Sequence, residues 1–350
     1  MSDILKMFVP MLLCAVTCVL LGLTAIPLLR ARMTGRFEPR IGSRFKTDGS
    51  EPVMGGAVLV LAFALWYFPL SLTGDISRSS NIQDSRAGLI LAGIYVIAVT
   101  AVGIAEDRLR HFLARPAGVS KLFKQLLIYT LSLSLTLGLT AFSSSSTEVL
   151  LPFHLGYIEF GVLYYPLTAL VMTLAVNLSK LLFCFGGDTS GSVGGLSELT
   201  GAVSLLSVSV CCRIVYSYAG QIFADCAAAA CIGMLFWTLA PSKLITGESG
   251  SLCIGAMLSA AVLLTKLEFL FLLTSVPQII DLAGGAFCFA RGRKAYRDTG
   301  AIPPRSLHRA LLDKGRGSYT VLLIFLLPAL AGAALSLIFA YYAGAFVIRI

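Results

Sequence analysis

Charged residues are scarce in this sequence. Asp, Glu, Lys and Arg together make up 13% of the chain, whereas hydrophobic residues make up 57%. A soluble globular domain carries roughly 25% charged residues, so this chain has too few to cover a water-facing surface of its size. The composition therefore excludes an ordinary soluble domain and indicates that lipid surrounds much of the protein.

Three further features are missing or scarce, and they exclude or disfavour two classes of membrane protein. Hydrophobic and polar residues do not alternate along the chain, which excludes a transmembrane β-barrel. Ionisable residues within the hydrophobic stretches are few, and the sequence has no internal repeat. Many transporters have ionisable residues in their membrane spans and are built from repeats. The sequence thus predicts membrane-spanning helices and disfavours a transporter.

The cysteine pattern also excludes some structures. The chain has 9 cysteines, which show no metal-ligand spacing and no arrangement typical of an extracytoplasmic disulfide framework. They lie within or beside apolar stretches, so we expect them to pack as small apolar side chains. The first apolar stretch lacks a small-residue cleavage site, which predicts a retained helix instead of a signal peptide.

The hydrophobic stretches predict an all-α, polytopic integral membrane protein. A helix needs about 20 residues to cross the hydrocarbon core of a bilayer. About ten stretches reach or approach this length, and we interpret residues 1–350 as a single membrane-embedded domain. The predicted spans are 4–29, 53–72, 87–105, 122–142, 158–183, 199–215, 219–239, 251–264, 265–289 and 318–345.

The formal net charge is +9, and the positions of the basic residues along the chain are explained by the membrane topology. In a soluble protein such a balance would suggest a nucleic-acid partner, which we do not expect here. Most of the Lys and Arg residues fall in alternate loops, and cytoplasmic loops are the ones enriched in basic residues. This bias predicts both termini outside, a plasma or inner membrane location, and a polar face on the cytoplasmic side.

Polar residues gather in the predicted cytoplasmic loops, in five separate segments. These segments contain carboxylates, glycine-rich turns and cations. Such a set at one membrane face is typical of an enzyme that joins a water-soluble substrate to a lipid-borne one. The segments are 46–56, 103–110, 175–179 followed by 185–198, 241–252 and 303–308.

These residue types match the requirements of phosphoryl transfer. Carboxylate oxygens are the ligands of a hard divalent cation, and glycine-rich turns that open into helices offer N–H groups to phosphate. Basic side chains would neutralise a diphosphate. The carboxylates are Glu106, Asp107, Asp188, Glu198 and Glu248, and the cations include Lys46, Arg110 and Lys124.

Each feature also has an ordinary structural explanation. Glu106 to Arg110 could be a solvated helix end, and Gly247 to Ser251 could be a simple turn. His308 alone is more often a surface residue than a catalyst, and basic loops also follow from topology and anionic lipid. Function is favoured by the whole set, in this order and on one membrane face.

The ordered motifs resemble those of the phospho-N-acetylmuramoyl-pentapeptide transferases (MraY-type enzymes), in the polyprenyl-phosphate phosphosugar transferase superfamily. Pro52-Val-Met-Gly-Gly56 is similar to the family's Thr-Pro-Thr-Met-Gly-Gly, and Gly103 to Arg110 is similar to Gly-Phe-x-Asp-Asp-x-x-Lys. Pro241 to Leu252 resembles the segment ending in Gly-Asp-Thr-Gly-Ser-Leu. The resemblance runs from about residue 20 to 340.

The resemblance implies a function and a set of ligands. It implies transfer of phospho-MurNAc-pentapeptide from UDP to undecaprenyl phosphate, with Mg²⁺ as cofactor, in peptidoglycan synthesis. It also implies ten helices, and a homodimer because family members often pair.

The resemblance assigns roles to individual residues. Glu248 and Asp107 are the expected metal ligands, and Glu106, Asp107, Asp188 and His308 are the expected catalytic residues. Asp188 would lie beside the lipid phosphate. Substrate binding is expected of Lys46, Arg110, Lys124 and Asn177.

Several family residues are replaced in this chain. The paired aspartates are Glu106 and Asp107, and the metal-binding aspartate is Glu248. Another family aspartate corresponds either to Lys180 or, after an insertion, to Asp188. Lysine in place of an acid would repel a metal. The alternative prediction is therefore a catalytically impaired paralogue that binds polyprenyl phosphate, a nucleotide or a cell-wall membrane protein.

Overall fold

The computed structural model describes most of the chain, and all structural statements below refer to these residues. The described ranges are 2–32, 52–73, 85–111, 119–142, 147–151, 156–183, 193–299 and 306–347.

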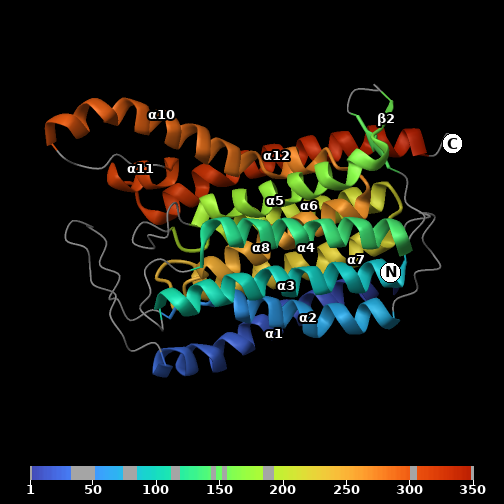
Figure 1. Ribbon diagram of the computed structural model, residues 1–350. Helices are drawn as coiled ribbons and strands as arrows, with labels where there is room; N and C mark the ends of the chain where they lie inside the picture. The colour runs from blue at the N-terminus through green and yellow to red at the C-terminus, as the bar shows by residue number, and fades with distance from the viewer. Residues whose placement is uncertain are drawn as a thin grey trace.

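The described chain is a bundle of long helices, with one two-stranded hairpin at its edge (Figure 1). The hairpin pairs β1 (Glu148–Leu150) with β2 (Tyr157–Glu159). The helices are α1 (Ser2–Arg32), α2 (Gly55–Thr73), α3 (Arg86–His111), α4 (Lys121–Phe142), α5 (Tyr164–Phe183), α6 (Leu196–Ile214), α7 (Tyr218–Thr238), α8 (Gly247–Thr265), α9 (Leu270–Thr274), α10 (Val276–Thr299), α11 (Leu307–Asp313) and α12 (Ser318–Val347).

Within the described ranges, 9 helices are long and apolar enough to cross a membrane. They coincide with nine of the predicted spans, so the prediction of an all-α, multi-pass membrane protein is confirmed. The remaining prediction, 265–289, is divided between the short helix α9 and helix α10. Pro277 lies in the first turn of α10, where proline starts a helix readily, and the second half of α10 is rich in Arg and Lys.

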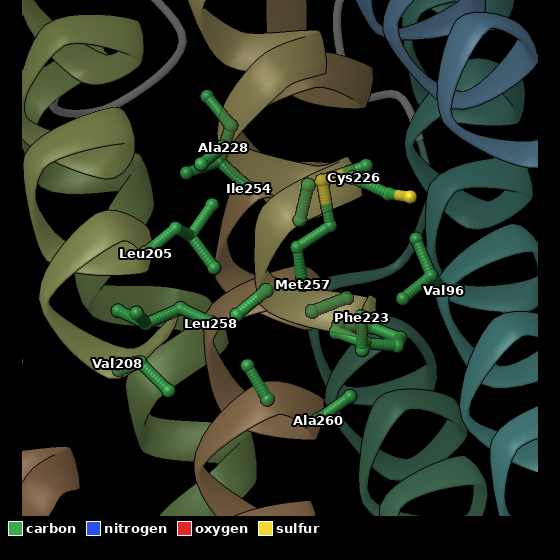
Figure 2. Packing of buried hydrophobic residues seen from close by; sticks show 14 of the residues in the cluster. Val96, Leu205, Val208, Phe223, Cys226, Ala228, Ile254, Met257, Leu258 and Ala260 are labelled. Carbon is green, nitrogen blue, oxygen red and sulfur yellow. The ribbon is translucent and has the colours of Figure 1, made fainter. Parts of the chain in front are cut away.

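Helix α8 lies at the centre of the bundle, and 94% of the residues in its most apolar stretch are buried. Figure 2 shows Met257 and Leu258 of this helix among side chains from α6 and α7, including Leu205 and Phe223. Small residues allow neighbouring backbones to approach α8 closely. At Gly255, for example, an added Cβ would lie 2.7 Å from the Cα of Val176 in α5.

Successive long helices run in opposite directions, so alternate helix ends meet at one end of the bundle. The C-terminal ends of α3 and α5 therefore lie near the N-terminal ends of α4 and α8. Helix α10 projects from this end, whereas the hairpin and the last turns of α12 lie at the other (Figure 1).

Two of the predicted polar segments join directly at this end. Residue Val53 forms a parallel β-bridge with Ile245, and the backbone N–H of Ile245 donates to the carbonyl of Pro52 at 2.9 Å. The N–H of Gly55 returns a bond to the carbonyl of Ile245 at 3.0 Å. These bonds hold the start of α2 against the start of α8.

Candidate active site

Asp107 caps the N-terminus of α8. One of its carboxylate oxygens accepts from the backbone N–H of Glu248 at 3.0 Å, and the other accepts from that of Ser249 at 2.9 Å. The first N–H groups of a helix have no partner within the helix, and a carboxylate there is stabilised by the helix dipole. Asp107 therefore fixes the position of α8 relative to α3.

Two glycines make this approach possible. Gly247 has a φ of +75°, a region that glycine adopts readily, and an added Cβ would lie 2.6 Å from Oδ2 of Asp107. At Gly103, an added Cβ would lie 2.5 Å from the Cα of Ser249. Larger residues at either position would separate Asp107 from the first turn of α8.

The side chain of Glu248 binds two lysines from other helices. Its Oε1 atom lies 2.8 Å from Nζ of Lys124 in α4 and 2.7 Å from Nζ of Lys180 in α5. All three side chains are largely buried, with exposed fractions of 16%, 7% and 13% for Glu248, Lys124 and Lys180. Charge-assisted bonds of this length are among the stronger hydrogen bonds in proteins.

Glu106 completes a group that we call the acid–lysine cluster. Its Oε2 atom accepts from the backbone N–H of Val119 at 3.1 Å and lies 3.6 Å from Nζ of Lys124. The cluster consists of Glu106, Asp107, Lys124, Lys180 and Glu248.

Asn177 lies one helical turn before Lys180. Its side-chain amide exchanges two hydrogen bonds with that of Gln125, at 2.7 and 2.8 Å, and Gln125 directly follows Lys124. The amide pair thus joins α4 to α5 beside the two lysines of the cluster.

The cluster residues do not fit a bound divalent cation. Mg²⁺ binds carboxylate oxygens at about 2.1 Å, but Oε1 of Glu248 already binds two ammonium groups. Both oxygens of Asp107 accept backbone N–H groups, and this residue is 2% exposed. Across the described residues, no three His, Cys, Asp or Glu side chains are grouped so that they could hold a metal ion.

His308 lies in α11, away from these partners. Its backbone N–H donates to Oδ1 of Asp281 at 2.9 Å, and its Nδ1 atom lies 3.1 Å from both carboxylate oxygens of the same residue. Ser306 contacts its other ring nitrogen at 3.4 Å. These contacts join α11 to α10 and involve no member of the acid–lysine cluster.

Three other predicted site residues fall outside what the structure describes. Lys46 and Asp188 lie outside the described residues, as does the side chain of Arg110, whose backbone lies in the last turn of α3. Glu198 lies at the start of α6 and is bonded to the hydroxyls of Ser197 and Thr246. It lines a small pocket beside the cluster, together with Gly194, Gly195 and the loop before α8.

Gln125 and Asp281 were not among the residues predicted from the sequence. A signal for Asp281 was present, because it is an acidic residue inside a predicted apolar span. Gln125 offered a weaker signal, since a polar residue beside a lysine at a helix start is common.

The bundle and the cluster together define a class of protein. Apolar helices enclose a group of carboxylates and lysines contributed by α3, α4, α5 and α8, so this is a multi-pass membrane protein with a polar site at one end. The chain belongs to glycosyl transferase family 4, whose model matches residues 89–266. All five cluster residues lie within the matched region, whereas His308 lies outside it. The family confirms the prediction of a transferase-like enzyme.

Curated relatives cover most of the chain at low identity. A phospho-N-acetylmuramoyl-pentapeptide-transferase of Desulfitobacterium hafniense is 24% identical over 97% of this chain and 99% of its own length. The protein of that name from Symbiobacterium thermophilum is 25% identical over 85% of each chain. A third, from Clostridioides difficile, is 26% identical over 77% of this chain and 75% of its own.

Proposed function

We propose that this protein transfers a phosphosugar from a UDP-linked donor to a polyprenyl phosphate in peptidoglycan synthesis. By similarity to its relatives, the donor is UDP-MurNAc-pentapeptide and the acceptor undecaprenyl phosphate. An oxygen of the lipid phosphate attacks the sugar-bearing phosphorus, the bond to the bridging oxygen breaks, and UMP leaves. The single observation that supports this most strongly is the acid–lysine cluster inside the family-matched region.

The chain's own residues would bind and orient the phosphates. Lys124 and Lys180 present ammonium groups at the end of the bundle where the polar segments meet. Glu248 and Glu106 hold these ammonium groups in place, and Asp107 fixes the helix that carries Glu248. We place this end of the bundle on the cytoplasmic side, where UDP-linked donors are available.

The resemblance implies Mg²⁺ dependence, but the described carboxylates do not fit the cation. Oε1 of Glu248 already binds two ammonium groups, and both carboxylate oxygens of Asp107 accept backbone N–H groups. Asp188 remains a proposed catalytic residue beside the lipid phosphate, and Lys46 and Arg110 remain proposed substrate contacts. His308 was predicted to be catalytic, but its bonds to Asp281 favour a role in positioning α11 against α10.

A transfer assay with purified full-length protein tests the proposal. In detergent, with UDP-MurNAc-pentapeptide and undecaprenyl phosphate, we expect release of UMP and formation of a lipid-linked product. Lys124→Ala should reduce the rate by about 100-fold, which is the lower end of the loss found when one positioned donor to a transition-state oxyanion is removed. The proposal fails if the protein gives no product, with or without Mg²⁺, in conditions where a relative is active.

A second function is favoured by the bonds within the cluster. Two lysines neutralise Glu248, the expected ligand of the catalytic metal. A protein without that metal would bind polyprenyl phosphate through the lysines and transfer nothing to it. Saturable binding of undecaprenyl phosphate in the absence of any product would support this second function over the first.

A further inference from the structure

Lys180 occupies the position in the acid–lysine cluster where a metal ion would bind Glu248. It extends from the last turn of α5 and bonds directly to Oε1 of Glu248. Glu248 is the residue that the family resemblance implies as a metal ligand. The structure thus has an ammonium group at the carboxylate where a divalent cation was expected.

These distances mean that Glu248 cannot bind Mg²⁺ and the two ammonium groups at the same time. A Mg²⁺ ion on Oε1 of Glu248 would lie within about 5 Å of the nitrogens of both Lys124 and Lys180. Like charges this close in a largely buried site repel strongly. Mg²⁺ also dehydrates reluctantly and needs near-ideal octahedral geometry, which this environment does not offer.

The two lysines can take over one role of a divalent metal ion, which is to bind and neutralise phosphate oxygens. Each ammonium carries three N–H donors, and the bond to Glu248 uses one of them. Lysine binds phosphate as a compact point charge. Both side chains keep some exposure, 7% for Lys124 and 13% for Lys180, so neither ammonium group is fully enclosed by the protein.

We propose that the ammonium groups of Lys180 and Lys124 replace a divalent cation, so that this site binds phosphate groups without metal. The ligand is a phosphate ester or diphosphate, from either the nucleotide donor or the lipid acceptor. This inference rests on the proposed phosphate-handling role of the site, but it concerns binding and not transfer.

Diphosphate binding in EDTA provides the first test. Titration calorimetry of the full-length protein in detergent, with inorganic pyrophosphate as probe, should show binding that added Mg²⁺ does not strengthen. Lys180→Ala should weaken this binding at least 10-fold, whereas Lys180→Arg should retain most of it and show that the fold is intact. Lys243→Ala is the matched control, since Lys243 is exposed, lies at the same end of the bundle and contacts Trp237 instead of Glu248.

Direct metal binding provides the second test. Electron paramagnetic resonance with Mn²⁺ should detect no stoichiometric site in the unmodified protein. Lys180→Asp changes the local charge by two units and supplies a further carboxylate beside Glu248, so this variant should gain a Mn²⁺ site and lose metal-free diphosphate binding. One Mn²⁺ bound by the unmodified protein and lost in Glu248→Gln would overturn the inference.

Two further binding measurements identify which molecule supplies the phosphate. They also separate the proposal of metal-free binding from the proposal of phosphosugar transfer. UDP and undecaprenyl phosphate in micelles each replace pyrophosphate as probe, and the one whose binding depends on Lys180 is the ligand. Diphosphate binding that requires Mg²⁺ overturns this inference but leaves transfer standing. Metal-free binding without transfer supports the inference and removes the proposed function.

Discussion

Lys266 is a largely enclosed cation, with 12% of its side chain exposed, at the opposite end of α8 from the acid–lysine cluster. Its ammonium donates to the hydroxyl of Tyr164 at 2.6 Å and lies 3.2 Å from Oε1 of Glu268. The hydroxyl of Tyr164 donates to the same carboxylate oxygen at 2.7 Å. Burial lowers the pKa of Lys266 from its ordinary value of 10.5, and the nearby Glu268 carboxylate only partly opposes this.

The lowered pKa of Lys266 predicts a pH-dependent stability. Between its folded pKa and 10.5, the unfolded chain binds more protons than the folded chain, so the free energy of unfolding rises with pH through that window. Below the folded pKa, the full cost of the buried charge is present. Thermal unfolding in detergent should therefore show that the stability of the unmodified protein relative to Lys266→Met increases from pH 7 towards pH 10.

The exposed Lys314 supplies the control for this measurement. Lys314→Met should give a stability profile parallel to that of the unmodified protein over the same pH range. Parallel profiles for Lys266→Met as well would contradict the assigned effect of burial.

Single residues also show which parts of the site could be predicted from the sequence and which could not. The sequence identified Glu106, Asp107, Lys124 and Glu248 as candidates, and the structure places all four in one cluster. It left open whether Lys180 or Asp188 follows the family's aspartate, and Lys180 lies directly on Glu248. Which atom of a side chain meets which partner depends on helix rotations of a few degrees, and local patterns do not encode these.

The contact between α3 and α8 sets the geometry of the candidate site. Gly103→Ala should destabilise the protein by about 1–3 kcal/mol, because its new methyl group would meet the backbone of Ser249 at 2.5 Å and neither helix can retreat freely. Chemical unfolding in detergent would measure the loss, and the transfer assay should show reduced activity as Asp107 moves away from α8.

Gly138→Ala in α4 is the matched variant. Its methyl group would approach only the end of the Leu91 side chain, at 2.8 Å, which can move aside. Both substitutions gain a similar amount of helix propensity, so the difference between them isolates the effect of packing. Equal stabilities for the two variants would show that the approach of α3 to α8 is not tightly constrained.

At the level of helices, hydropathy predicted most of the structure because each span depends on its own composition. Nine predicted spans coincide with helices long and apolar enough to cross a membrane. The segment 265–289 was harder, because its apolar residues continue past a break at Ser275 and Pro277. The hydrogen bond between His308 and Asp281 could not be predicted either, because the two residues are 27 positions apart and belong to different helices.

The whole molecule has two chemically different ends. One end holds the acid–lysine cluster and the projecting α10–α11 segment, and the other holds the β1–β2 hairpin (Figure 1). The distribution of basic residues predicts that the cluster end faces the cytoplasm. The proposed reaction requires this orientation, because a charged UDP-linked donor does not cross the membrane unaided.

Cysteine labelling in a host cell tests the orientation of the molecule. Seven of the described cysteines are buried, so a background with Cys184→Ser and Cys288→Ser should react little. On that background, Glu159→Cys in the exposed strand β2 should react with a membrane-impermeant maleimide in intact spheroplasts. Asp313→Cys at the end of α11, also exposed, should react only after the membrane is opened. The reverse pattern would place the lysines of the cluster outside, beyond the reach of cytoplasmic nucleotides, and would refute the proposed transfer.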